Sequence, residues 1–334
     1  MKDSLLATGY APKDAPGSFD LPEPSWLLVT PMGHVIVLAE MKEGLWGAYR
    51  AVSGQWTRVA MGQTGGSLPC HAVLFGDFLL VAHYGDGSVT ALRLEDDGLP
   101  GKAVTAIAPS PGAHAHGLVP LDSAHLLLID LGREVLELYQ SNSPSEVSLE
   151  LKATLSLASF SGEGETRAIG PRHLAVHPKL PLAYVVTEYS NELLVVEMGL
   201  SPPRLKEKFR VSLLPAFWAE PSFAGTVKVS PDGNFLMATN RGHDSVVSFT
   251  LEEGAPTLPV WTSSGGKWPR DAALSGSGDS LAVANQKSDK VTVFGRDPKT
   301  GILTPRADYR VAGASCVVFG SDGAPTLDSF DNTL

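Results

Sequence analysis

PRHLAVHPKLPLAYVVTEYSNELLVVEM, residues 171 to 198, contains three short apolar segments separated by turn residues. In the first two segments the apolar side chains alternate, at Leu174 and Val176 and again at Ala183 and Val185. Such alternation predicts strands with one buried face, and the intervening HPKLP carries the residues of a tight turn. The stretch therefore predicts strand, turn, strand, short loop and strand.

The same pattern recurs along the chain, in AGTVKVSPDGNFLMATNRGHDSVVSF at 224 to 249 and PRDAALSGSGDSLAVANQKSDKVTVF at 269 to 294. Aligning the residue that opens the first strand of each unit places seven unit starts about 45 to 56 residues apart, at Ser25, Cys70, His116, Arg172, Gly225, Arg270 and Ser315. Four short antiparallel strands need about 40 to 50 residues, the length of one propeller blade. The sequence predicts an all-β fold in one domain over residues 1 to 334, a seven-bladed β-propeller.

The last unit is too short for a complete blade, because Ser315 is followed by only about 20 residues of a 334-residue chain. We expect the N-terminal segment, around residues 4 to 10, to supply the missing strand and close the ring, which removes an exposed sheet edge. The two longest units carry their extra residues at about 141 to 170 and 199 to 224. These ranges are predicted to form loops that overhang one face.

Composition indicates the class of protein and its cellular location. The chain is 43% hydrophobic, with 34 Gly and 25 Pro distributed along it, which is typical of a folded domain with many turns. It contains no run of 18 apolar residues and no secretory signal at its start, so we expect a cytoplasmic protein without a membrane partner. A net charge of -10 argues against nucleic-acid binding. Cys70 and Cys316 are predicted to be free buried thiols, and the protein is expected to be a monomer or a weak homo-oligomer.

Two sets of residues are predicted to line one mouth of the propeller channel, because first strands begin and second strands end on the same face. The first set consists of the unit starts. The second consists of the second-strand ends: Glu40, Tyr84, Asp130, Glu188, Arg241 and Gln286. Residues that only maintain a repeat keep their type from unit to unit, whereas both sets vary and are rich in ionisable groups. This mouth is therefore the predicted functional site.

Three arginines of these sets, Arg172, Arg241 and Arg270, come from adjacent units and predict a positive wall in an acidic protein. Guanidinium groups bind carboxylates and phosphates through parallel charge-assisted hydrogen bonds. The wall therefore predicts capture of an anion. The alternative is that the arginines stitch blades together in structural pairs, Arg241 with Glu188 and Arg270 with Asp271.

The histidines suggest a metal only weakly. His114 and His116 are two residues apart, a spacing that metal sites use. No third ligand is placed by the sequence, and the neighbouring arginines would repel a divalent cation, so neither a metal nor a cofactor is expected. His173 follows Arg172 and, by strand alternation, is predicted to point away from it, into the packing between blades or toward backbone.

Several catalytic classes are excluded, since the chain has no nucleophile elbow, phosphate-cradling glycine loop, CxxC pair or HExxH helix. General acid and base catalysis on an anion held by arginines remains. The predicted catalytic residues are Glu188, His116 and Arg172, and the predicted substrate-binding residues are Arg241, Arg270, His114, Asp130, Gln286 and Tyr84.

Three strings carry a resemblance to a known family: GPRHLAVHP, VSPDGNFLMATNRGHDSV and PRDAALSGSGDSLAVANQKSDKVTVFGRDPKTGILT. From about residue 24 to 319 the chain resembles the lactonase family of seven-bladed propellers, which includes the propeller-type 6-phosphogluconolactonases and the carboxy-cis,cis-muconate cyclases. The proposed active site of the cyclase branch is a histidine, an arginine, a glutamate sixteen residues beyond it and a further arginine. The matching residues are Arg172, Glu188 and Arg241, with His116 or His114 as the histidine.

The resemblance implies a metal-independent lactonase acting on a small anionic lactone, such as the phosphorylated sugar lactone 6-phosphogluconolactone. Arg241 and Arg270 would hold the phosphate or carboxylate, Arg172 would stabilise charge on the ring carbonyl, and Glu188 or His116 would activate water. Two alternatives stay open. One is a cyclase that closes a carboxylated muconate to its lactone, and the other is a propeller that binds a ligand without turnover.

Overall fold

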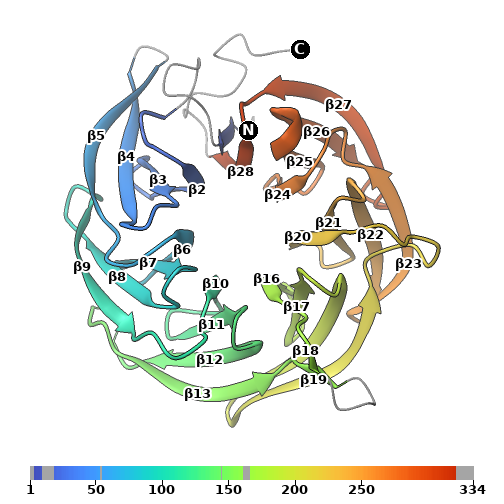
Figure 1. Ribbon diagram of the computed structural model, residues 1–334, viewed down its shortest axis with the longest axis horizontal. Coiled ribbons are helices and arrows are strands. Elements are labelled where there is room, and N and C mark those ends of the chain that lie inside the picture. Colours follow the sequence, from blue (N-terminus) through green and yellow to red (C-terminus); the bar gives the residue numbers. More distant parts are fainter. Residues whose placement is uncertain (1–3, 10–18, 53–54, 144, 161–165, 321–334) are drawn as a thin grey trace.

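The computed structural model describes residues 4–9, 19–52, 55–143, 145–160 and 166–320. These residues form 28 short strands and a single 3₁₀ turn, η1 (Gln286–Ser288). The strands build antiparallel sheets arranged radially around a central channel (Figure 1). The predicted all-β propeller is therefore confirmed.

Six of the sheets have four strands, paired in chain order from the channel outward. Blade one contains β2 (Pro24–Val29), β3 (Val35–Ala39), β4 (Leu45–Val52) and β5 (Gln55–Gln63). Blade two contains β6 (Pro69–Phe75), β7 (Phe78–His83), β8 (Val89–Leu94) and β9 (Pro100–Ile107). Blade three contains β10 (Ala115–Pro120), β11 (His125–Asp130), β12 (Val135–Ser141) and β13 (Leu149–Ser156), and is followed by the hairpin β14 (Ser159–Phe160) and β15 (Thr166–Arg167).

The next three blades follow the same plan. Blade four contains β16 (Pro171–Val176), β17 (Leu182–Thr187), β18 (Glu192–Leu200) and β19 (Pro203–Ser212). Blade five contains β20 (Phe223–Val229), β21 (Phe235–Arg241), β22 (Ser245–Glu252) and β23 (Ala255–Ser263). Blade six contains β24 (Pro269–Leu274), β25 (Ser280–Asn285), β26 (Lys290–Arg296) and β27 (Leu303–Arg310).

The remaining sheet joins the two ends of the described chain. β28 (Ala314–Gly320) pairs with β1 (Ser4–Gly9) in antiparallel register, and β28 lies between β24 of blade six and β2 of blade one (Figure 1). The other residues that a seventh blade would need, in 10–18 and 321–334, lie outside the described residues. A complete seventh blade and its closure by the N-terminal segment stay predictions.

The apolar core lies between neighbouring sheets, because each sheet buries both faces against the next. Blades three and four share one such cluster, in which Ile129 and Leu138 pack with Val185 and Leu194. A comparable cluster joins β28 and β1 to blade one. Burial of a Val, Leu or Ile side chain stabilises the fold by about 1.5–3 kcal/mol, so these clusters supply most of the driving force. Cys70 and Cys316 are buried and unbridged, as predicted.

The expected overhanging loops are only partly present. Residues 149–156 and 203–212, which fall within the two ranges, form the outer strands β13 and β19, because the fourth strand of each blade must come from this part of the repeat. Of the second range, residues 213–222 connect β19 to β20 without regular strands.

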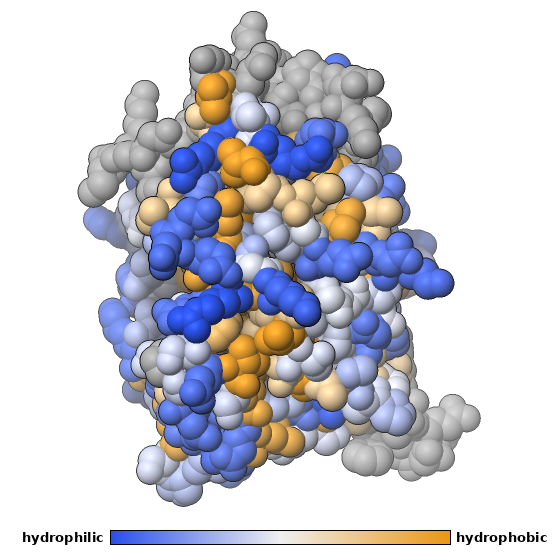
Figure 2. Space-filling model, turned by 90° about the vertical axis from the view of Figure 1, so that its left-hand side faces the viewer, coloured by the Kyte–Doolittle hydropathy of each residue, from blue (hydrophilic) through white to orange (hydrophobic). Residues whose placement is uncertain are grey.

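The outer surface mixes polar and apolar residues. On the side where β5 and β9 lie, Figure 2 shows apolar side chains interrupted by polar ones, with Met61 and Val104 among the exposed apolar residues. Among the described residues, no helix is long and apolar enough to cross a membrane.

Candidate active site

A β-bulge places the first set of predicted residues at the channel mouth. In each of the seven innermost strands the pairing register skips the residue that opens the repeat, so this residue has no partner on the second strand. The skipped residues are Ser25, Cys70, His116, Arg172, Gly225 (together with Thr226), Arg270 and Ser315. Bulges redirect side chains and are common beside active sites. The sequence alignment found these positions without revealing the bulge.

Several bulge side chains connect neighbouring innermost strands. The Ser25 hydroxyl donates to the Pro69 carbonyl at 3.3 Å, and the Ser315 hydroxyl donates to the Pro24 carbonyl at 3.0 Å. Arg172 follows the same rule, because its NH1 donates to the Gly225 carbonyl at 2.6 Å. One part of the Arg172 guanidinium is therefore structural, whereas its Nε lies beside Glu188.

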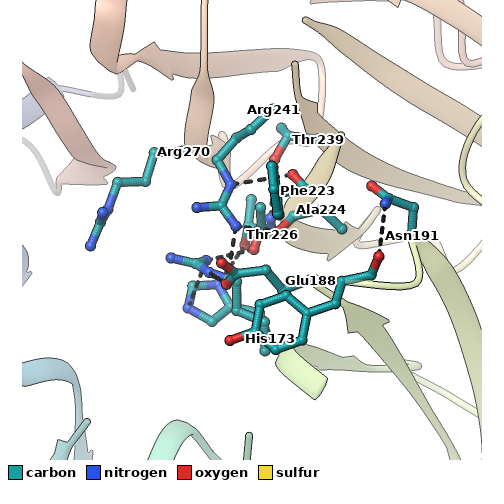
Figure 3. Close-up of polar contacts among 12 residues, drawn as sticks. His173, Glu188, Asn191, Phe223, Ala224, Thr226, Thr239, Arg241 and Arg270 are labelled. Carbon is teal, nitrogen blue, oxygen red and sulfur yellow. Dashed lines mark hydrogen bonds and ion pairs between the residues drawn. The ribbon is translucent and has the colours of Figure 1, made fainter. Parts of the chain in front are cut away.

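Glu188 lies between two of the predicted arginines. Its Oε2 atom is 3.1 Å from Arg172 Nε and 3.1 Å from Arg241 NH2. Figure 3 shows the Arg241 side chain directed toward this carboxylate. Arg241 is fixed from behind by its own blade, since Nε and NH2 donate to the carbonyls of Phe223 and Ala224 at 3.2 and 2.8 Å. The pair between Arg241 and Glu188, foreseen as the structural alternative, is thus present.

The two arginines are an unusual pair of buried cations. Arg172 and Arg241 are 3% and 5% exposed, whereas the Glu188 side chain is 19% exposed. Burial, followed by the repulsion of Arg172, lowers the pKa of Arg241 to about 9, and burial also lowers the pKa of Arg172. Both ion pairs have their short contact at Oε2 of Glu188, 3.1 Å in each case. Glu188 is therefore a partly exposed carboxylate that two buried arginines hold in place.

We call Arg172, Glu188 and Arg241 the trio. Arg270 lies to one side of Glu188 and Arg241 in Figure 3. Its NH2 is 3.0 Å from Glu40 Oε2, an ion pair that joins blade six to blade one. The structural alternative for Arg270 was wrong about the partner, because Asp271 faces Lys228 at 3.9 Å and accepts a hydrogen bond from the Val317 backbone. The bulge separates Arg270 from Asp271, so the adjacent carboxylate is not the one it meets.

His116 is buried beneath the mouth, with a side chain 6% exposed. Its Nδ1 atom is buried and has no hydrogen-bond partner among the described residues. Desolvation, reinforced by Arg172, holds the pKa of His116 well below its usual value of 6.5. The ring is therefore neutral at physiological pH, able to donate or accept one hydrogen bond but poorly suited to act as a base.

His173 lies between blades four and five, as predicted, but it does not point away from Arg172, and that part of the prediction was wrong. Its Nε2 lies 3.4 Å from Arg172 NH1, and its Nδ1 is 3.0 Å from the Thr226 hydroxyl. Simple alternation fails here because the bulge shifts the register between Pro171 and His173. Burial and then Arg172 keep the pKa of His173 well below 6.5.

A cluster of neutral rings continues below the arginines. His173 contacts His116 and His71, with ring centroids 5.2 and 5.5 Å apart, and His71 lies 4.2 Å from Trp26. Burial, then Lys228 and Arg172, lowers the pKa of His71 to about 3. The described residues contain no group of three or more His, Cys, Asp or Glu arranged to hold a metal. Sequence reasoning placed His71 near the mouth but missed Trp26, because a ring contact leaves no spacing signal.

The other predicted residues make contacts of their own, outside the trio. Tyr84 stacks on His114 with centroids 4.7 Å apart and meets the edge of His116 at 5.9 Å, so these three share one side of the mouth. Asp130 is instead held inside blade three by Arg133, whose Nε is 2.6 Å from Oδ2. The Gln286 side chain makes no hydrogen bond within the described part of the chain, although its backbone nitrogen donates to Trp268.

Asp244, within the string NRGHDS, explains why that string is distinctive. It has a left-handed backbone conformation, φ 56°, and its Oδ1 accepts hydrogen bonds from the Gly242 and Trp268 backbone nitrogens at 3.2 and 2.8 Å. This carboxylate ties blade five to the entry of blade six. The motif therefore positions Arg241 and Trp268, whose ring centre is 5.7 Å from the Arg241 guanidinium carbon.

A pocket of about 540 Å³ lies between the loop that follows β17 and the connection from β19 to β20, and its lining does not include Arg172, Glu188 or Arg241. Its lining includes Tyr189, which follows Glu188 in the chain, and Phe223, whose carbonyl binds Arg241. Residues 214 and 218–222 form its outer wall and include Trp218. The site thus combines a fixed carboxylate with buried cations, and the residues next to Glu188 and Arg241 in the structure border a partly aromatic recess of the size of a small ligand.

The chain is similar in sequence and in structure to known lactonases. Residues 11–319 match the family described as "Lactonase, 7-bladed beta-propeller". A 6-phosphogluconolactonase of Bacillus subtilis is 30% identical over 75% of this chain and 73% of that protein, and one of Cronobacter sakazakii is 27% identical over 71% and 68%. The periplasmic gluconolactonase PpgL of Pseudomonas aeruginosa superposes with a TM-score of 0.81 at 25% identity, covering 96% of this chain and 99% of PpgL.

Proposed function

The chain belongs to the lactonase family of seven-bladed β-propellers, and we propose that it is a lactone hydrolase that opens a small anionic lactone of the 6-phosphogluconolactone type. The names of the Bacillus subtilis and Cronobacter sakazakii relatives support the reaction. The cationic mouth supports an anionic substrate. A cytoplasmic location remains our prediction for this chain, and the Pseudomonas aeruginosa relative is described as periplasmic.

The arrangement of Glu188 carries the proposal. Both arginines bind the same carboxylate oxygen, at 3.1 Å each, and so fix the direction of the other oxygen. A base held in one orientation by neighbouring groups meets the geometric requirement for activating water. A carboxylate used only as a structural clamp would gain more from pairing both oxygens with the two guanidiniums.

In the proposed reaction, Oε1 of Glu188 accepts a proton as a water oxygen forms a bond to the lactone carbonyl carbon. The resulting oxyanion lies against a guanidinium, for which Arg172 is the proposed donor. Collapse of this intermediate breaks the bond between the carbonyl carbon and the ring oxygen. The proton held by Glu188 passes to that ring oxygen, which leaves as a hydroxyl group, so the product is a hydroxy acid and the carboxylate of Glu188 is restored.

His116 is assigned a supporting role in this proposal. Because its ring is neutral and its Nδ1 lacks a partner among the described residues, it can hydrogen-bond a substrate oxygen or an ordered water beneath the carboxylate. Arg241 orients Glu188, and Arg270, whose side chain is 19% exposed, contacts the anionic part of the substrate.

The direct test is hydrolysis of freshly prepared 6-phosphogluconolactone, followed by titration of the acid released at constant pH. The enzyme rate is measured against the spontaneous opening of the lactone in the same buffer. We expect a rate that rises in proportion to protein concentration and persists after treatment with a chelator. A rate equal to the spontaneous one, for both this lactone and gluconolactone, would contradict the proposal.

A further inference from the structure

The charges at the mouth do not suffice for a phosphorylated substrate. The three arginines are accompanied by the two glutamates Glu188 and Glu40, each in an ion pair with at least one of them. This leaves an excess of about one positive charge, whereas a phosphate monoester carries about -1.5 to -2 at pH 7. Recognition of such a group therefore calls for another cation at the rim.

Lys287 has the position and the exposure that such a cation needs. It lies in η1, directly after the second strand of blade six, and its side chain is exposed. Its Nζ is 3.2 Å from the centre of the Trp268 ring, the same ring that contacts the Arg241 guanidinium. The Lys287 ammonium thus lies at the outer edge of the mouth, on the side of the Arg241 and Glu188 pair.

The backbone around Lys287 is held in place by the neighbouring segment. Its nitrogen donates to the Lys267 carbonyl at 3.1 Å, and the Lys267 nitrogen donates to the Ser288 hydroxyl at 2.8 Å. Trp268 is anchored in turn by Asp244. Because the Lys287 side chain is exposed, its contact with the partly buried Trp268 ring is weak, so the ammonium can turn to a phosphate at little cost while its backbone stays fixed.

We propose that Lys287 binds the phosphate of the substrate and determines the preference for phosphorylated over neutral sugar lactones. The lactone ring lies against Glu188, and the phosphate at the far end of the sugar meets Lys287 over the Trp268 ring. This inference rests on the proposed function for its substrate class. It assigns Lys287 to binding of the remote group and to no step of the bond-breaking chemistry.

Binding of the two product acids tests this without turnover. Titration calorimetry with 6-phosphogluconate and with gluconate compares the native protein with Lys287→Gln, Lys287→Arg and the control Lys299→Gln. Lys299 is also exposed and belongs to blade six, but it lies in the turn between β26 and β27, at the opposite end of the blade. It therefore controls for the loss of one positive charge.

We expect Lys287→Gln to weaken 6-phosphogluconate binding roughly 10- to 100-fold, the usual effect of losing a hydrogen bond between charged groups. Gluconate binding should stay unchanged, Lys287→Arg should recover most of the affinity, and Lys299→Gln should behave as the native protein. Equal loss for both acids would show a disturbed loop, and no loss for either would assign the phosphate elsewhere. Either result overturns the inference, as does a native protein that does not prefer 6-phosphogluconate.

The outcomes for the proposed function are separate. A native protein that shows the Lys287-dependent preference but hydrolyses neither lactone would refute the enzymatic function and leave the phosphate site standing. If Lys287→Gln hydrolyses 6-phosphogluconolactone as well as the native protein does, only the role of Lys287 is refuted.

Discussion

Replacing Glu188 by Gln separates the catalytic and the structural interpretation of the arginine cluster. The side chain keeps its size and one oxygen acceptor, but it can no longer accept a proton from water at neutral pH. If Glu188 is the base, turnover should fall by roughly 100- to 10,000-fold. Substrate affinity should change much less, because the amide still fills the same place in the mouth.

The structure also sets the expected effect on stability. Glu188→Gln leaves Arg172 and Arg241 buried beside a neutral oxygen, yet each guanidinium keeps a backbone carbonyl, at Gly225 and at Ala224 respectively. The loss is therefore that of charge-assisted hydrogen bonds rather than of all partners, about 1–3 kcal/mol in the free energy of unfolding. A protein of this size should remain folded at 25 °C.

Glu40→Gln is the matched control. Glu40 is also a carboxylate at the mouth, is 20% exposed in its side chain, and pairs with Arg270 at 3.0 Å, but it has no proposed part in proton transfer. We expect it to keep turnover near that of the native enzyme. The assay is acid release from 6-phosphogluconolactone at saturating concentration, with urea unfolding measured on the same samples.

Near-native turnover in Glu188→Gln would refute the role of Glu188 as base. Equal losses of turnover in Glu188→Gln and Glu40→Gln would show instead that the mouth responds to any change in charge. A loss of stability without a loss of turnover would leave Glu188 as a structural partner of the two arginines.

Three further predictions concern affinity, pH and the motif. Arg270→Ala should raise KM for a phosphorylated lactone more than it lowers kcat, since an anion contact remote from the reacting atoms acts in both bound states; the reverse pattern in steady-state kinetics would place Arg270 at the carbonyl. Because the pKa of buried His71 is lowered to about 3, the unfolded chain binds a proton that the folded one does not as pH falls below 6.5. The stabilising effect of neutral His71 is complete above that pH and is lost progressively toward pH 3. The free energy of unfolding of His71→Gln, measured in urea, should therefore depend less on pH over this range than that of the native protein. Parallel pH dependences of the two proteins would contradict the burial effect. Asp244→Ala should lower the free energy of unfolding by about 1–3 kcal/mol, because two backbone nitrogens lose a charged acceptor. Asp244→Asn should lower it less, because Asn tolerates positive φ and keeps an oxygen acceptor. Equal unfolding midpoints for the two variants would show that these hydrogen bonds contribute nothing.

The repeat architecture and the candidate mouth were accessible from the sequence because both depend on local patterns. Apolar alternation and turn residues determine each strand pair, and their recurrence at a near-constant spacing specifies a propeller. Chain connectivity then requires that first-strand starts and second-strand ends share a face. For this reason Arg172, Glu188 and Arg241, which come from two blades, could be assigned to one mouth before any contact was known.

The exact contacts depended on tertiary structure, because they arise from a change of one residue in register. The bulge in β16 allows Arg172 and His173 to contact each other, which strict alternation excludes. In β24, Arg270 forms its ion pair with Glu40 rather than with the adjacent Asp271. The partners of Trp268 are likewise decided by the packing of blade five against blade six. A sequence pattern records which residues alternate, whereas the position of a bulge and the charge that a side chain meets across the channel depend on how the blades close around it.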